Sequence, residues 1–295
     1  MTNEHNTKKL GWTILLNVVI TIAEYIGGLL SGSLALLSDA GHNLSDVISL
    51  IMGYFGERIS DKKADKKHSF GFKRVEIFTA LINALSLIAI GFYILFEAVQ
   101  RMNETHTISL GIMLGVGSIG LLGNLISILI LNKDKDKDST VNMKAAYLHL
   151  FYDTLSSVFV IISAVVIYFT NLVIIDIIVS AIIAMMILFS SFEIIKKTIH
   201  ILMQGLPQGL EFDELFHTIS KIKGVKSVHN LHVWAVNSSN NFLSCHVCAD
   251  KESIKDSDKL IKRINEELQK KYSIDHTVIQ IEKDDLCKTG AVCGK

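Results

Sequence analysis

Long apolar stretches separated by short polar connectors dominate the first two-thirds of the chain. Each stretch exceeds the roughly 18 residues that a membrane-spanning helix needs. Because an even number of crossings returns the chain to the side where it began, both termini are expected on one side of the membrane. The stretches predict six membrane helices, at about residues 10–30, 33–56, 75–99, 107–131, 145–170 and 172–193.

Two connectors hold most of the positive charge of this part of the chain. Residues 58–74 include seven lysines and arginines, and residues 132–144 include four lysines. Cytoplasmic connectors of membrane proteins are enriched in these residues. The pattern therefore places both connectors and both termini in the cytoplasm. We expect a multi-pass protein of the plasma membrane, which in a bacterium is the inner membrane.

The last third of the chain has the pattern of a soluble domain. Amphipathic stretches at 211–222 and 256–271 predict helices, and alternating stretches at 225–236, 241–249 and 276–282 predict strands. The order α-β-β-α-β indicates a small cytoplasmic α+β domain with both helices on one face of a sheet. We therefore divide the chain into a membrane domain at 1–200, a linker at 201–209 and a cytoplasmic domain at 210–295.

Composition supports a membrane protein and restricts its partners. Apolar residues make up 49% of the chain and charged residues only 20%, against about 25% charged in a typical soluble domain. The zero net charge argues against a nucleic-acid-binding role, which needs a basic face. All the cysteines lie in the last third, where a reducing cytoplasm favours metal ligation over disulfides.

Two predicted membrane helices carry the same pair of polar residues. His42 and Asp46 lie four apart in the second helix, and His149 and Asp153 lie four apart in the fifth. Residues four apart share one face of a helix. Two imidazoles and two carboxylates would complete the tetrahedral shell that Zn²⁺ favours. Because ionisable groups inside a membrane are costly, a functional role is favoured over a structural one.

The chemistry of these ligands suggests an exchange mechanism. Imidazole and carboxylate groups bind protons and metal ions at the same lone pairs, so the two compete. A site that opens alternately to each side would export the metal and admit protons. We therefore predict a secondary active transporter, not an enzyme, with Zn²⁺ as its transported substrate and no organic cofactor.

Four motifs in this order resemble the cation diffusion facilitator family, in particular its bacterial zinc/cadmium/cobalt-resistance branch. They are the His42–Asp46 pair, the stretch 68–77, the His149–Asp153 pair and the stretch 228–234. The resemblance implies a homodimer whose cytoplasmic domains have a metallochaperone-like fold. It also implies metal–proton exchange at the site shared by the second and fifth helices, with His42 favouring zinc.

The resemblance also implies metal sites outside the membrane. Some relatives bind a second metal at the connector between the second and third helices, where Asp65 and His68 match but Phe72 replaces a second histidine. In the cytoplasmic domain it points to a regulatory zinc site, with a purely structural dimerisation domain as the alternative. The ligands implied there are His229, His246 and Glu282, assisted by Cys287 and Cys293.

The neighbouring cysteines of the cytoplasmic domain have a different pattern. Cys245 and Cys248 lie three apart on a predicted strand, so they are expected to point to opposite faces of the sheet. We therefore expect them not to bind one ion together, and at least one of them to be an ordinary buried thiol.

Three other functions compete with zinc export. The same transporter could carry Co²⁺, Cd²⁺, Fe²⁺ or Mn²⁺, although the imidazoles argue against Mn²⁺. A membrane-bound zinc sensor would bind the ion without moving it. An intramembrane metalloprotease would need a motif such as His-Glu-x-x-His, which the sequence lacks.

Overall fold

A computed structural model provides the structure of the chain, and it describes the backbone of residues 2–60, 64–102, 107–132 and 141–283. Side chains are described in these ranges except at 2–16, 46, 49–58, 60, 130–132 and 141–150. The chain forms two compact units. The first comprises residues 1–55 and 79–195, and the second comprises 56–78 and 196–295.

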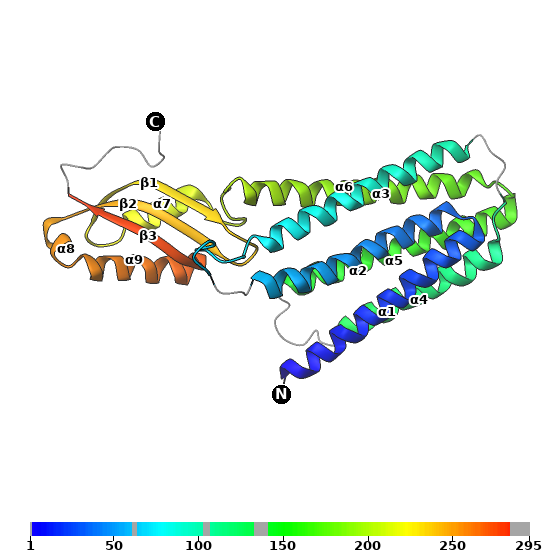
Figure 1. The fold of residues 1–295 in the computed structure, drawn as a ribbon, viewed down its shortest axis with the longest axis horizontal. Coiled ribbons are helices and arrows are strands. Elements are labelled where there is room, and N and C mark those ends of the chain that lie inside the picture. Colours follow the sequence, from blue (N-terminus) through cyan, green and yellow to red (C-terminus); the bar gives the residue numbers. More distant parts are fainter. Residues whose placement is uncertain (1, 61–63, 103–106, 133–140, 284–295) are drawn as a thin grey trace. The chain divides into compact units, whose positions relative to one another are not determined.

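The first unit is built from long helices (Figure 1), and each predicted apolar stretch lies almost entirely within one of them. Among the described residues, α3, α4, α5 and α6 contain segments long and apolar enough to cross a membrane, and α1 has a shorter apolar segment from Asn17 to Ser31. The chain is thus a multi-pass membrane protein. The helices are α1 (Thr2–Ser31), α2 (Leu34–Ser60), α3 (Val75–Arg101), α4 (Leu110–Asn132), α5 (Val141–Thr170) and α6 (Ile174–Leu202).

The turn between α1 and α2 is fixed by a carboxylate from another helix. Asp176 of α6 accepts hydrogen bonds from Ser33 Oγ (2.6 Å) and from the backbone N–H of Leu34 (2.7 Å). These are donors at the start of α2, which the helix itself cannot satisfy. Arg101 of α3 donates to the carbonyl of Gly32 in the same turn. The polar contacts therefore hold α2 in place beside α3 and α6.

The second unit contains the predicted cytoplasmic elements and one more short helix. The order is α7 (Phe212–Ser220), β1 (Val225–Ala235), β2 (Asn241–Ala249), α8 (Lys251–Lys255), α9 (Ser257–Tyr272) and β3 (Ile274–Glu282). The sheet order is β1-β2-β3, with β1 antiparallel and β3 parallel to β2 (Figure 1). Buried side chains of α7, α9 and the sheet form a single core, which includes Leu215, Leu243 and Ile264.

The connector between α2 and α3 packs against this sheet within the second unit. The ring of Phe70 lies 5.5 Å from that of Phe242 and 6.3 Å from that of His276, measured between centroids. Lys73 Nζ lies over the ring of Phe242, and Ser238 donates a hydrogen bond to Glu76 near the start of α3. These contacts join the connector to the beginnings of β2 and β3.

Candidate metal sites and family

The membrane unit brings one predicted ligand of α2 against one of α5. His42 Nε2 lies 3.3 Å from Asp153 Oδ1, and the Asp153 side chain is almost completely buried. The backbone places Asp46 one turn after His42 on α2, and His149 one turn before Asp153 on α5. The side chains of Asp46 and His149 lie outside the described residues, so half of the predicted shell is observed directly.

A network of buried polar side chains adjoins the His42–Asp153 pair. Asp39, one turn before His42, accepts hydrogen bonds from Ser156 Oγ (2.5 Å) and Ser157 Oγ (3.1 Å) of α5. Asn124 of α4 donates to Ser157 Oγ. Three helices therefore meet around Asp39 through side-chain hydrogen bonds, which suits a region where water is excluded.

Glu24 of α1 is a further carboxyl group in this region. Its side chain is fully buried, and Asn43 of α2 donates a hydrogen bond of 2.6 Å to its Oε2 atom. A Cβ atom added at Gly120 of α4 would overlap Glu24 Oε1, so the glycine makes room for the carboxyl group. The sequence alone does not reveal the role of Glu24, because a single carboxylate in an apolar helix does not show its partners.

The connector residues Asp65 and His68 also lie together. The Asp65 carboxylate accepts backbone hydrogen bonds from His68 (2.6 Å) and Lys67 (2.7 Å), and His68 Nδ1 lies 3.2 Å from Asp65 Oδ1. The backbone hydrogen bond from His68 is the main cause that lowers the pKa of Asp65. Phe72 packs its ring on His68, at 4.4 Å between centroids. This pair is half exposed and stabilises a turn.

The cytoplasmic domain gathers its predicted ligands at the end of the sheet. His229 of β1 is paired in register with His246 of β2, and Glu282 is at the end of β3. His229 Nε2 lies 3.1 Å from Glu282 Oε2, and His246 Nδ1 lies 2.7 Å from Glu282 Oε1. Glu282 thus joins the two imidazoles. Cys287 and Cys293 lie outside the described residues.

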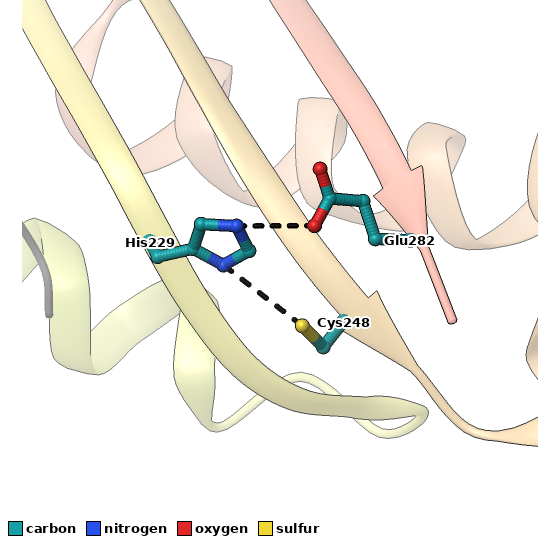
Figure 2. Close-up of side chains that lie close together, drawn as sticks. All are labelled: His229, Cys248 and Glu282. Carbon is teal, nitrogen blue, oxygen red and sulfur yellow. Dashed lines mark hydrogen bonds and ion pairs between the residues drawn. The ribbon is translucent and has the colours of Figure 1, made fainter. Parts of the chain in front are cut away.

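Cys248 completes this cluster, although the sequence analysis did not name it as a ligand. Figure 2 shows the His229 ring between Glu282 and Cys248, and Cys248 Sγ lies 3.9 Å from His229 Nδ1. One donor atom from each of these three residues lies within 4.8 Å of the others. A signal was present in the sequence: Cys248 is two residues after His246, and alternate residues of a strand share a face.

Cys245 has a different environment, as predicted for a residue three positions from Cys248. It is a buried, free thiol within the core of the cytoplasmic domain. Burial raises its pKa to about 12. It is therefore the ordinary buried thiol that the spacing predicted.

Comparison with known proteins gives the context of these sites. A family profile for the cation efflux transmembrane domain matches residues 12–203, and a profile for the cation efflux cytoplasmic domain matches residues 207–284. The two matches cover nearly the whole chain in the expected order.

Curated relatives match along almost their full length. The chain is 38% identical to a cadmium, cobalt and zinc/H⁺-K⁺ antiporter of Bacillus subtilis over 96% of this chain and 91% of the relative. It is 36% identical to the zinc transporter ZitB of Pectobacterium atrosepticum over 97% and 90%. It is 35% identical to the metal cation efflux protein CzcD of Cupriavidus metallidurans over 94% and 87%.

These matches confirm the predicted resemblance and exclude the metalloenzyme and the simple sensor as the main function. The chain belongs to the cation efflux family, and it is a metal-cation transporter rather than an enzyme.

Proposed function

We propose that the chain exports Zn²⁺ from the cytoplasm by exchange with protons. Support comes from relatives whose names specify zinc transport and antiport, and from the ligand types at the membrane site. In this proposal all six long helices cross the membrane. Both termini and both basic connectors face the cytoplasm of a bacterial inner membrane.

The observation that carries the proposal is the approach of His42 to Asp153. Their 3.3 Å separation joins α2 to α5 within the membrane unit, where a buried carboxylate without compensation would be costly. The donor atoms of a tetrahedral zinc site lie about 2.0–2.2 Å from the ion. An ion beside this pair would complete its shell with Asp46 and His149, which the helical backbone places one turn away on the same faces.

Competition between the ion and protons then drives exchange. Binding of Zn²⁺ requires neutral imidazoles and ionised carboxylates, so it displaces protons. On the outer side, protons return to the same lone pairs and release the ion. Histidine is suited to this exchange because its ordinary pKa is near neutrality. The chain's own residues thus bind the ion, hold the protons and connect α2 with α5.

The choice of zinc depends on the two imidazoles. A shell of two nitrogens and two oxygens suits a borderline cation better than Mn²⁺. Co²⁺ and Cd²⁺ fit the same donors, and the relative from B. subtilis is named for both of them as well as zinc. These two ions are therefore the competitors to test beside zinc.

We further propose that the cytoplasmic domain pairs two subunits and binds regulatory zinc. The Glu282 carboxylate lies within hydrogen-bonding distance of both imidazoles, those of His229 and His246. Imidazole and carboxylate groups are zinc ligands. Cys287 and Cys293 could add ligands from the end of the chain. The domain bounds of this proposal are 1–200 for transport, 201–209 for the linker and 210–295 for regulation.

Asp65 and His68, in the connector between α2 and α3, have a smaller role in this proposal. Asp65 is engaged by two backbone N–H groups, and Phe72 covers the face of His68 where another histidine would be needed. Asp65 and His68 supply too few ligands for a stable zinc site, which requires about four. They could hold an ion only briefly.

A transport assay of the Asp153→Ala variant tests the membrane site. In proteoliposomes with an imposed pH gradient, we expect the wild type to move Zn²⁺ against the proton flow. We expect the variant to lose more than the roughly 10–100-fold that removing only a hydrogen-bonding partner of a metal ligand costs. The measurements are zinc and pH dye signals in the same vesicles. Tyr152→Phe is the matched control, because Tyr152 is half exposed on the same helix.

Equal rates of Zn²⁺ transport by the wild type and by Asp153→Ala would contradict the proposal that Asp153 is a ligand of the transported ion. If the wild type moved Co²⁺ or Cd²⁺ but not Zn²⁺, the ligand shell would stand and the choice of ion would be wrong.

A further inference from the structure

Glu24 of α1 carries a buried carboxyl group that the predicted metal shell does not use. It is the only fully buried glutamate among the described residues. Its Oε2 atom accepts the 2.6 Å hydrogen bond from Asn43 Nδ2, and its Oε1 atom has no hydrogen-bond partner in the described part of the chain. One oxygen of the carboxyl group is therefore held by α2, and the other is buried and unsatisfied.

The packing around Oε1 gives it no water and little room. The oxygen points at Gly120 of α4, where an added Cβ atom would lie only 2.0 Å away. Ser157 Oγ lies 3.7 Å from the same Cβ position, but its proton is already donated to Asp39 Oδ2 at 3.1 Å. A carboxylate charge in such a place lacks the compensation that burial requires, whereas a neutral carboxylic acid does not need it.

The groups that face Glu24 are mostly acidic. Its carboxyl group interacts electrostatically with Asp39 and His42 of α2 and with Asp153 of α5. The described side chains of α1, α2, α4 and α5 include no lysine or arginine, and those of α4 include no ionisable group. Three buried carboxyl groups thus share a region where, among these side chains, only His42 can become a cation. Like charges so placed favour binding of a proton or of another cation.

We propose that Glu24 is a proton-binding site outside the metal shell, which holds a proton while the shell is empty and releases it when a divalent cation binds beside His42 and Asp153. This inference rests on the proposed exchange of Zn²⁺ for protons and adds a proton carrier to it. The shell ligands exchange because ion and proton compete for the same lone pairs. Glu24 exchanges through charge, because the charge of the ion replaces that of the proton in a region of low dielectric constant.

Asn43 connects the proton site to the shell. It follows His42 directly along α2, and it is the hydrogen-bond donor to Glu24. Neither Asn43 nor Gly120 is a predicted ligand, so Glu24 is held by residues outside the shell. A movement of α2 that repositions His42 also repositions the donor to Glu24. The proton site and the shell therefore change together.

The coupling between ion and proton acts in both directions, as thermodynamic linkage requires. If a bound ion displaces the proton from Glu24, a proton on Glu24 weakens binding of the ion by the same factor. Protons arriving from the outer side then release the ion by two routes, at the ligands and at Glu24. A carboxyl group on α1 in this way increases the number of protons exchanged for each ion without adding a ligand.

The number of protons moved per Zn²⁺ provides the first test. Full-length protein in proteoliposomes is given an imposed pH gradient, and zinc and pH dyes record both initial fluxes in the same vesicles. Glu24→Gln keeps the shape of the side chain and an oxygen to accept from Asn43, but it cannot bind the proton. We expect its ratio of protons to Zn²⁺ to fall by about one, and Glu24→Asp to keep the wild-type ratio. Tyr25→Phe is the matched control, because Tyr25 is the next residue of α1 and is half exposed.

The outcomes separate this proton site from the exchange on which it rests. An unchanged ratio in Glu24→Gln, even with a lower Zn²⁺ flux, would overturn the proton-binding role and leave Glu24 as a structural contact between α1 and α2. A wild type that moves Zn²⁺ with no proton flux would refute the exchange itself.

Infrared difference spectroscopy of the wild type makes a second test that does not depend on whether a variant folds. The carbonyl stretch of a protonated carboxyl group should disappear when Zn²⁺ is added to the full-length protein in detergent. Isotope labelling of glutamate shifts this band only if it belongs to a glutamate rather than to an aspartate of the shell. We expect a labelled band to be lost on addition of Zn²⁺, since Glu24 is the buried glutamate of the described chain. If no glutamate band is lost, the proposal is wrong.

Discussion

At the residue scale, small changes in position along one strand produce different chemistry. Cys245 belongs to the hydrophobic core, whereas Cys248 lies against His229. Strand alternation predicted that the two thiols would separate. It did not predict which of them would join a cluster of potential metal ligands, because that depends on the neighbouring strands. His229 and Glu282 reach Cys248 only through the pairing of β1 and β3 with β2.

The thiol of Cys245 should be unreactive in the folded protein. Its pKa of about 12 keeps it protonated at pH 8, where roughly one molecule in ten thousand would carry the reactive thiolate. We expect iodoacetamide to leave Cys245 unmodified at pH 8 and to modify it readily after unfolding, as measured by mass mapping of the reduced chain.

The pH dependence of this thiol has a defined sign. Because its pKa is raised in the folded state, the neutral thiol favours folding, and this contribution is lost as pH rises above the unfolded value of about 8.5 towards 12. Rapid alkylation of folded protein at pH 8 would show that the thiol is not held in the core.

At the element scale, glycines allow α1 and α4 to pack closely. A Cβ atom added at Gly120 would overlap Glu24, whereas one added at Gly115 would meet nothing within 4 Å. At Gly27 of α1 it would lie 2.7 Å from the Val116 side chain. Small residues at helix–helix contacts are the usual means of close approach in membranes. The sequence shows these glycines, but only the packing shows which of them face another helix.

Replacing Gly120 by alanine should therefore be far more harmful than replacing Gly115. Gly120→Ala must displace the buried Glu24 carboxyl group or separate α1 from α4, at a cost of about 1–3 kcal/mol for overpacking. We expect a lower unfolding temperature in detergent and reduced zinc flux for Gly120→Ala, and little change for Gly115→Ala. Equal unfolding temperatures for the two variants would contradict the proposed packing of Glu24 against α4.

At the scale of the whole molecule, sequence order and compact units do not coincide. The connector after α2 and the start of α3 belong to the same unit as the cytoplasmic domain, although more than a hundred residues separate them along the chain. Phe70 is largely exposed, yet its ring contacts those of Phe242 and His276. The basic charge of the connector predicted its side of the membrane but not this association.

Removing the Phe70 ring should loosen the connector. An aromatic contact of this kind contributes about 0.5–1.5 kcal/mol, so Phe70→Ala should increase amide hydrogen exchange over residues 64–74 by several-fold. Lys66→Ala is the control, because Lys66 is exposed in the same segment. Exchange that stays at the wild-type rate in Phe70→Ala would show that these ring contacts do not hold the connector.

The sequence by itself determined the helices and strands of this protein and the types of side chain that could bind a metal ion. Each apolar stretch became a long helix, and the strands at 225–235 and 241–249 lie where alternation predicted them, because hydrophobic periodicity is a local property. The four-residue spacing likewise placed Asp46 near His42 and Asp153 near His149 on their helices. The tertiary structure decided which groups meet: His42 with Asp153, Glu24 with Asn43, and Cys248 with His229. These contacts join residues distant in sequence, so they follow from helix packing and strand register rather than from any local pattern.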